Sequence, residues 1–259
     1  MIDRPLHLMV GMVFRNAADT LPSALDSVHG QAACGARVSV LLVDDGSTDG
    51  WREALAERLN RRDLHIRQVD FRSAAMARNF VLHEVEQAFP DVDYICRLDA
   101  DDVLAGPDVL RHVVAVLERG RPDVLVAGNW QALNGKRLPL PNSATLELLD
   151  AARLVARLQR MAEGDSGAEL PSCNTIVRRG LPARYPLVHS AEDHWYLTTL
   201  LLGQRTWRVD VAADLLYAEY RLRGGLTKQN AKTDAYFRSR RDLLQFARRQ
   251  LDEGLFGKG

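Results

Sequence analysis

The chain has few cysteines and no excess of charge of either sign. Its three cysteines, Cys34, Cys96 and Cys173, are scattered, with neither zinc-site nor redox spacing. Cysteines used in this way suit a reducing compartment, so we expect a cytoplasmic protein. Lysine and arginine total 34, and so do aspartate and glutamate. This balance gives no electrostatic reason to expect a nucleic-acid partner.

Long apolar runs and glycine-rich phosphate motifs are also missing. No apolar run reaches the length that spans a bilayer, and a strand predicted from Leu6 leaves no room for a signal peptide. No strand precedes G-x-G-x-x-G and no G-K-[ST] occurs, which excludes a Rossmann dehydrogenase and a P-loop enzyme. Residues 45–50 are spaced like half an EF-hand loop, but Ala56 replaces its last glutamate and a strand precedes it, so we reject a calcium site.

The apolar periodicity predicts strands that alternate with amphipathic helices. The strands are expected at 6–13, 37–43, 64–69, 92–98 and 123–128, and the helices at 19–30, 50–60, 73–88 and 107–119. This alternation favours an α/β fold, with a single Rossmann-like, mainly parallel central sheet flanked by helices. After Trp130 the pattern loosens, and further helices are expected at 146–162, from Glu192 onward, and at 234–253.

Two of the predicted strands end in clusters of aspartate. The clusters are Asp44 and Asp45, after the strand at 37–43, and Asp99, Asp101 and Asp102, after the strand at 92–98. In an open α/β sheet, ligands bind at the carboxyl ends of the strands. Crowded carboxylates repel one another unless a cation lies between them, and Mg²⁺ and Mn²⁺ prefer oxygen ligands. For a D-x-D segment taken alone, a solvated acidic turn is the alternative.

The order of these segments resembles that of the family 2 glycosyltransferases, which have the GT-A fold. The matching pieces are Phe14–Leu21, Ala77-Arg78-Asn79, the D-x-D motif at Asp99–Asp102, Ser172–Arg179, the E-D motif at Glu192-Asp193, and Tyr220-Arg221 with Gly224-Gly225. Each piece is weak alone, but together they follow the family's order over residues 6–228. The resemblance implies a GT-A domain over 1–228, with a nucleotide-sugar-binding half (1–130) and a smaller acceptor-binding half (131–228), followed by a helical tail (229–259).

The resemblance also implies an activity. It predicts the metal-dependent transfer of one sugar, with inversion, from a nucleotide-diphosphate sugar, with UDP expected, to a hydroxyl of a glycan, a lipid-linked or a small-molecule acceptor. The implied roles are catalytic base for Asp193, Mn²⁺ or Mg²⁺ binding for Asp101 and Asp99, nucleotide-sugar binding for Asp45, Asp44, Arg15, Arg78, Asp99 and Arg221, and acceptor binding for Glu192, Asn174 and Trp195.

Several of these residues have an alternative structural role. Asp45 could stabilise a turn, and Arg78 could form an interior ion pair with an aspartate of the D-x-D segment. Glu192 and Asp193 could simply favour a helix N-terminus electrostatically. Trp195 could belong to the core.

The chain departs from the family pattern at two points. Arg15 stands where an aromatic residue is usual, with Phe14 one position earlier, which puts stacking of the nucleobase in doubt. The Q-x-x-R-W motif of processive members is missing, so we expect transfer of a single sugar. The competing classes are a non-catalytic nucleotide-sugar or carbohydrate-binding protein and a sugar nucleotidyltransferase. The carboxylates that are present argue against the first, and the lack of a glycine-rich basic loop after the first strand argues against the second.

The last segments carry two further expectations. Residues 220–227 are expected to close over the bound donor, with Arg221 or Arg223 near its diphosphate. Residues 234–253 are expected to form a helix with a narrow apolar stripe. The stripe could dock on its own domain, form a homodimer, or make a peripheral contact with an anionic membrane.

Overall fold

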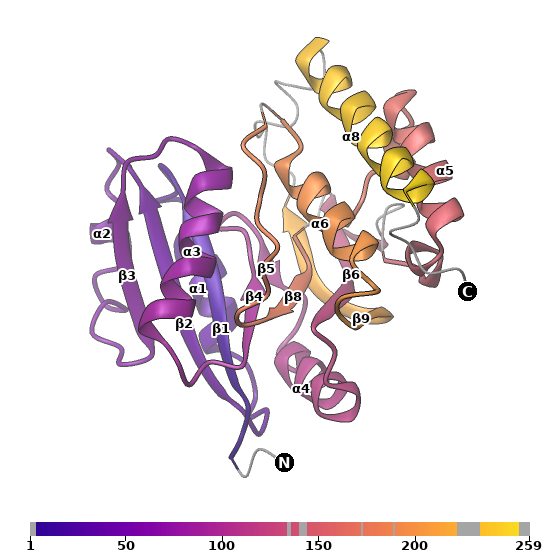
Figure 1. Ribbon diagram of the computed structural model, residues 1–259. Helices are drawn as coiled ribbons and strands as arrows, with labels where there is room; N and C mark the ends of the chain where they lie inside the picture. Colours follow the sequence, from indigo (N-terminus) through magenta and orange to yellow (C-terminus); the bar gives the residue numbers. More distant parts are fainter. Residues whose placement is uncertain are drawn as a thin grey trace.

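A single mixed sheet runs through the molecule in the computed structural model, which describes residues 4–133, 136–139, 144–171, 173–188, 190–221 and 234–253. The strand order is β3-β2-β1-β4-β8-β6-β9-β5, with β7 paired to β6. Figure 1 shows β3, β2 and β1 side by side at one end of the sheet. The strands are β1 (His7–Phe14), β2 (Arg37–Asp45), β3 (Leu64–Val69), β4 (Tyr94–Arg97), β5 (Val103–Leu104), β6 (Val124–Leu133), β7 (Lys136–Pro139), β8 (Thr175–Arg178) and β9 (Val209–Arg221).

Most of the described strands run in one direction. β3, β2, β1 and β4 are parallel neighbours, and β9 is parallel to β6. β8 lies antiparallel between β4 and β6, so those two strands share a direction, while β5 and β7 are reversed. The predicted α/β class and the mainly parallel sheet are therefore confirmed. The parallel edge of β3, β2, β1 and β4 comes from residues 7–97, and the three reversed strands follow it in the sequence.

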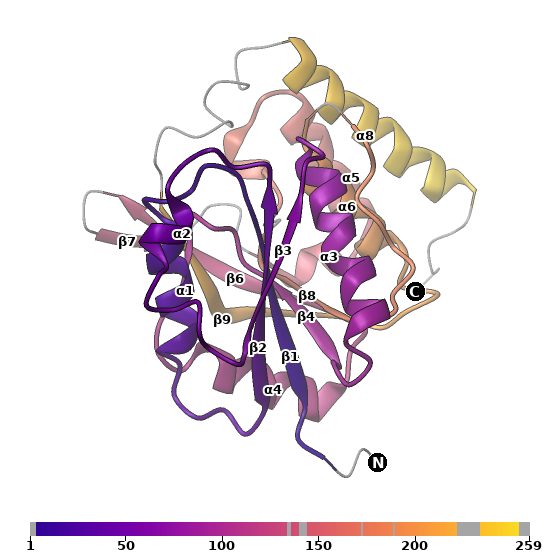
Figure 2. The ribbon, with the colours of Figure 1, turned by 90° about the vertical axis from the view of Figure 1, so that its left-hand side faces the viewer.

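Helices cover both faces of this sheet (Figure 2). They are α1 (Leu21–His29), α2 (Trp51–Ala54), α3 (Ala74–Ala88), α4 (Val109–Gly120), α5 (Ala151–Ala162), α6 (Glu192–Leu202) and α8 (Asp234–Asp252), with 3₁₀ turns η1 (Leu146–Leu149) and η2 (Ser166–Ala168). In β1, Leu8 and Val10 pack in one core layer with α1 and α4, whereas Met9 belongs to the layer of α3, α5, α6 and α8. Successive side chains of this buried strand point to opposite faces of the sheet and therefore pack in two separate core layers.

Two predicted helices differ from those observed. The helix expected at 50–60 ends at Ala54, and the chain continues in turns of i→i+3 type, such as Arg58 N–H to the Leu55 carbonyl at 2.7 Å. The helix expected at 146–162 is interrupted at Asp150. That residue is extended and caps α5 by accepting a hydrogen bond from the Arg153 N–H at 2.9 Å. The preference of aspartate for the N-cap therefore overrides the apolar period.

The C-terminal helix α8 packs on its own domain. Leu243, Leu244 and Ala247 are buried in the core layer that α5 and α6 share, and the Phe246 ring lies 5.1 Å from that of Trp195. Most of the apolar side of α8 is therefore covered by the same chain, and a homodimer or membrane contact stays a prediction. Among the described residues, no helix combines the length and the apolar character that crossing a membrane requires.

Candidate active site

Three aspartates gather where the chain turns after β4. The turn is closed by the Asp102 N–H, which donates to the Asp99 carbonyl at 3.1 Å. The Asp102 side chain is buried, that of Asp99 is half-buried, and that of Asp101 is exposed. The D-x-D segment thus lies at the carboxyl end of a buried parallel strand, as the sequence predicted.

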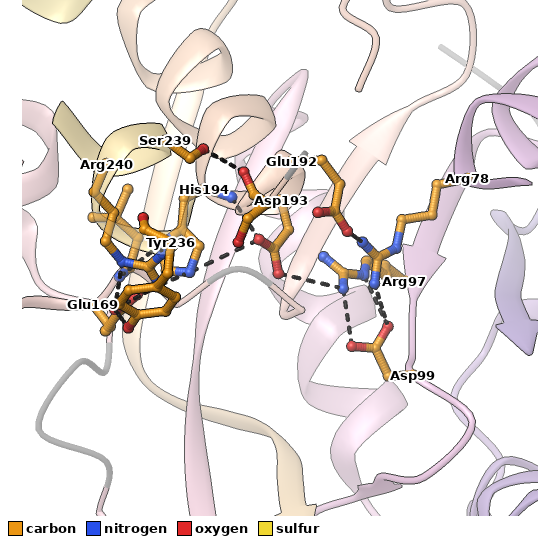
Figure 3. A network of polar contacts seen from close by, with 12 residues as sticks. Arg78, Arg97, Asp99, Glu169, Glu192, Asp193, His194, Tyr236, Ser239 and Arg240 are labelled. Carbon is orange, nitrogen blue, oxygen red and sulfur yellow. Dashed lines mark hydrogen bonds and ion pairs between the residues drawn. The ribbon is translucent and has the colours of Figure 1, made fainter. Parts of the chain in front are cut away.

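Two arginines hold Asp99 (Figure 3). Arg97, the last residue of β4, is only 8% exposed and donates from Nε and Nη2 to the two Asp99 oxygens at 3.1 and 2.9 Å. Arg78 of α3 approaches Asp99 to 3.5 Å, so the ion-pair alternative for Arg78 is what the structure shows. Sequence reasoning missed Arg97. Its signal is a charged residue within an apolar strand, because a buried arginine almost always has a partner.

The same arginines reach the E-D motif at the start of α6. Arg78 Nη1 donates to Glu192 Oε1 at 2.5 Å, and Arg97 Nη2 lies 3.8 Å from Asp193 Oδ2 (Figure 3). The two acidic motifs are distant in sequence but converge on one pair of guanidinium groups. Asp193 is half-buried in the first turn of α6, where the helix dipole also favours a carboxylate.

A candidate metal centre lies in this cluster. Three atoms that could bind a metal lie within 4.8 Å of one another: a carboxylate oxygen of Asp99, a carboxylate oxygen of Asp102 and the Sγ atom of Cys173. Burial, together with the charges of Asp99 and Asp101, raises the pKa of Asp102 to about 8. Burial and Asp99 also raise the pKa of Asp101, although its side chain keeps contact with solvent at the rim. Such mutual repulsion is what a divalent cation relieves, and the carboxylates fit Mn²⁺ or Mg²⁺. Asp101 lies outside the close group, so its role as a ligand stays a prediction.

At the end of β2, both aspartates already hold backbone or side-chain donors. Asp45 accepts the N–H groups of Phe71, Arg72 and Ser73 at 2.7, 2.9 and 2.9 Å, so it fixes the turn before α3. Asp44 accepts the Ser47 N–H at 2.9 Å and side-chain bonds from Trp51 and Gln68 at 3.2 and 3.1 Å. Burial acts to raise the pKa of Asp44, but these bonds outweigh it and the pKa is lowered.

Asp45 therefore has the structural role that the sequence left open, which is to stabilise a turn. The nucleobase contacts of Asp44 and Asp45 stay predictions, and Asp45 Oδ1 and Asp44 Oδ2 each already accept two of these bonds.

The remaining donor-side residues lie at the surface or at the end of β9. Arg15 is exposed, while Phe14 is buried and meets the Trp51 ring edge-on at 5.1 Å, so Phe14 serves the core. The Arg221 N–H donates to Asp102 Oδ1 at 3.0 Å, which puts the end of β9 beside the acidic cluster. The loop expected to close over the donor lies outside the described residues from position 222 onward.

The predicted acceptor residues occupy different environments. Glu192 is in the arginine network already described. Asn174 is fully buried just before β8, and its side-chain amide has no hydrogen-bond partner within the part of the chain that the structure describes. Trp195 is half-buried against Phe246 of α8, which shows the core alternative for its ring.

Comparisons with known proteins identify the family. The model of the family described as glycosyl transferase family 2 matches residues 9–181, more than half of the chain, and the chain therefore belongs to this family. A teichoic acid poly(glycerol phosphate) polymerase of Staphylococcus epidermidis is 33% identical over 101 residues, which are 38% of this chain and 13% of that protein.

Solved structures share the fold. The S. aureus TarS fragment 1–349 in complex with UDP-GlcNAc superposes with a TM-score of 0.69 at 20% identity, covering 93% of this chain and 66% of that one. A mannosyltransferase of Pyrobaculum calidifontis, PcManGT, in complex with GDP-Man and Mn²⁺ gives a TM-score of 0.57 at 17% identity, covering 97% and 75%. The GT-A fold is thus confirmed. The chain spans 13% of the polymerase and less than two thirds of the TarS chains that it matches, from 43% to 66%.

Proposed function

We propose that this family 2 glycosyltransferase moves one sugar from a nucleotide-diphosphate sugar to an acceptor hydroxyl, with inversion and with the help of Mn²⁺ or Mg²⁺. The main support for this proposal is that carboxylates of the D-x-D and E-D motifs contact the same two arginines, Arg78 and Arg97. UDP is the nucleotide we propose, and the TarS complexes with UDP and UDP-GlcNAc support this choice. The proposed acceptor is a hydroxyl of a glycan, a lipid-linked or a small-molecule substrate.

The charges around the end of β4 support the metal requirement. Asp99, Asp102 and Glu192 lie with Asp193 around two arginines, and Asp101 adds a further carboxylate at the rim. A diphosphate would bring more negative charge into a site that is already short of positive charge. A divalent cation held by Asp99 and Asp102, with Asp101 alongside, would supply Lewis-acid neutralisation of the leaving diphosphate.

Asp193 is the proposed base. The positive end of the α6 dipole favours a carboxylate at this position, and the Arg97 guanidinium lies 3.8 Å from one of its oxygens. Removal of the acceptor proton by Asp193, as the hydroxyl attacks the anomeric carbon opposite the diphosphate, is a single displacement and inverts the configuration. We propose donor contacts for Asp44, Asp45, Arg15 and Arg221, and acceptor contacts for Glu192, Asn174 and Trp195.

The first test addresses the base. UDP release from UDP-GlcNAc and other UDP-sugars is measured with Mn²⁺, with and without candidate acceptors. Asp193→Asn keeps the shape of the side chain but not its basicity, so we expect kcat to fall by about two to four orders of magnitude with unchanged donor affinity. Asp214→Asn, at an exposed position in β9, is the matched control. A loss confined to donor binding would remove Asp193 from the catalytic role, and proton NMR of the product reports the anomeric configuration.

The second test addresses the metal. Asp101 is exposed, so Asp101→Ala is expected to leave the melting temperature unchanged within about 2 °C, since surface substitutions rarely exceed about 0.5 kcal/mol. We expect the same variant to lose most of the Mn²⁺-dependent activity, and excess EDTA to abolish activity in the wild-type protein. Undiminished turnover in EDTA would contradict the metal requirement.

A further inference from the structure

A second polar network lies behind the proposed base and centres on Glu169, which follows η2. Its Oε1 accepts hydrogen bonds from the Tyr236 hydroxyl at 2.6 Å and from Arg240 Nε and Nη2 at 2.9 and 2.7 Å (Figure 3). Arg240 is 3% exposed, and its guanidinium also lies 3.3 Å from the centre of the Tyr236 ring. The Glu169 carboxylate is half-buried, and these three bonds to one of its oxygens hold it in a fixed position.

The other oxygen of Glu169 faces His194, the residue after Asp193. Glu169 Oε2 lies 3.1 Å from His194 Nε2, and the Leu170 N–H donates to His194 Nδ1 at 3.4 Å. Because Nδ1 accepts a hydrogen bond, the proton of the neutral ring belongs on Nε2, directed at Glu169. Glu169 therefore fixes both the orientation and the tautomer of His194.

His194 in turn meets the base. Its backbone N–H donates to Asp193 Oδ1 at 2.9 Å, and its Nε2 lies 3.8 Å from the same oxygen. Arg97 faces Oδ2, so the two carboxylate oxygens of Asp193 are oriented from opposite sides. A base held at both oxygens keeps the geometry that proton transfer needs.

Helix α8 is attached to this turn at further points. The Ser239 hydroxyl donates to the Ser190 carbonyl, just before α6 begins, and Phe246 packs on Trp195 in the same turn as the base. Leu243 and Leu244 anchor α8 through the shared core. Apolar contacts alone would suffice to dock α8 on the domain. Burying charged groups is unfavourable unless they are fully paired, so docking does not explain why α8 carries the Arg240–Glu169 ion pair.

We propose that Glu169, held by Tyr236 and Arg240 of α8, fixes His194 and through it Asp193, which makes α8 a positioning element of the catalytic unit. This inference rests on the proposed function, because it assigns Asp193 the role of base. It adds a segment that lies beyond residues 9–181, where the family model matches. His194, Glu169 and Arg240 act through Asp193 and are positioning residues.

The test uses Glu169→Gln in the full chain. The Gln amide can accept from Arg240 with its oxygen, but its NH₂ group then faces His194 Nε2 and demands the opposite tautomer, which conflicts with the Leu170 N–H. With UDP-GlcNAc and Mn²⁺, we expect kcat for UDP release to fall about tenfold to a hundredfold with an unchanged KM, since small misplacements of a reacting group have effects of this size. His194→Gln leaves the Glu169–Arg240 pair intact and should cause a similar loss, which covers the case that Glu169→Gln folds poorly.

The matched control is Arg248→Gln, on the same helix. Arg248 is exposed and bonds only Gln159 among the described residues, so kcat should stay within a factor of two. Equal kcat in Glu169→Gln, His194→Gln and the control would contradict the positioning role, and so would a loss seen only in KM. If the wild-type protein released UDP from no UDP-sugar, the proposed function itself would be contradicted.

A second measurement does not depend on activity. Proton–nitrogen NMR of protein labelled with ¹⁵N-histidine reports the tautomer of each ring, and His194→Gln assigns the signal of His194. We expect the Nε2–H form in the wild-type protein and in Arg248→Gln, and a changed pattern in Glu169→Gln. An unchanged His194 signal in Glu169→Gln would overturn the inference even in an active enzyme.

Discussion

Replacement of Arg97 by methionine should destabilise the fold and the site together. Arg97 is 8% exposed and makes two bonds to Asp99, and it lies 3.8 Å from Asp193. Removing one partner of a buried ion pair costs about 3–5 kcal/mol, because the other partner keeps an uncompensated charge. The Asp99 and Asp193 side chains remain 30% and 22% exposed, so solvent screens part of this charge. We therefore expect a loss of about 2–3 kcal/mol.

For a chain of this size, such a loss lowers the melting temperature by about 4–12 °C. Differential scanning calorimetry and urea unfolding measure it. Arg61→Met, at an exposed pair with Asp63, is the control, and its effect should stay below about 1 kcal/mol. Adding Asp99→Asn to Arg97→Met removes the stranded charge, so the double variant should be more stable than the sum of the single losses predicts. Strict additivity, or a shift no larger than that of Arg61→Met, would refute the argument.

Two further outcomes follow from the structure. Burial is the largest cause of a lowered pKa at His7, His29 and His65, so their contribution to stability is full above about pH 6.5 and is lost as the pH falls through the folded-state values. Asp102 acts in the opposite direction over this range, because burial raises its pKa to about 8. The effect of His7 is therefore measured as a difference between variants: from pH 7 to pH 5 the melting temperature of His7→Gln should rise relative to that of the wild-type protein, and equal shifts in the two would contradict this. Asp45→Ala removes the acceptor of three backbone N–H groups at 71–73, which should lower the free energy of unfolding in urea by about 1–3 kcal/mol; an unchanged midpoint would exclude the turn role.

The sequence predicted what depends on local pattern. Strand β3 has the predicted limits, because an apolar alternation bounded by polar residues defines a strand without outside help. The acidic clusters at the ends of β2 and β4 were found for a related reason, since aspartates that directly follow an apolar strand stand out. The reversed strand β8 lies within Ser172–Arg179, a segment that the family resemblance identified, but its direction depends on pairing with β4 and β6, which no local pattern contains.

What the sequence could not predict are the contacts that join distant segments. Arg78 was placed near the aspartates, but its bond to Glu192 requires α3 and α6 to meet at the end of β4. Arg97 was missed because its partners, Asp99 and Asp193, come from both acidic motifs.

The Glu169 network shows this limit most clearly. It joins the segment after η2, the first turn of α6 and helix α8, and none of these segments carries a recognisable motif for the contact. Each of its side chains is ordinary in its own segment, and the apolar stripe of α8 predicts docking without saying on what. The network forms only in the folded chain, where Arg240 and His194 contact different oxygens of the Glu169 carboxylate. Residues that orient a base are therefore to be sought among charges near the motif that are paired with a buried partner, and in this chain that criterion selects Glu169, which Arg240 holds.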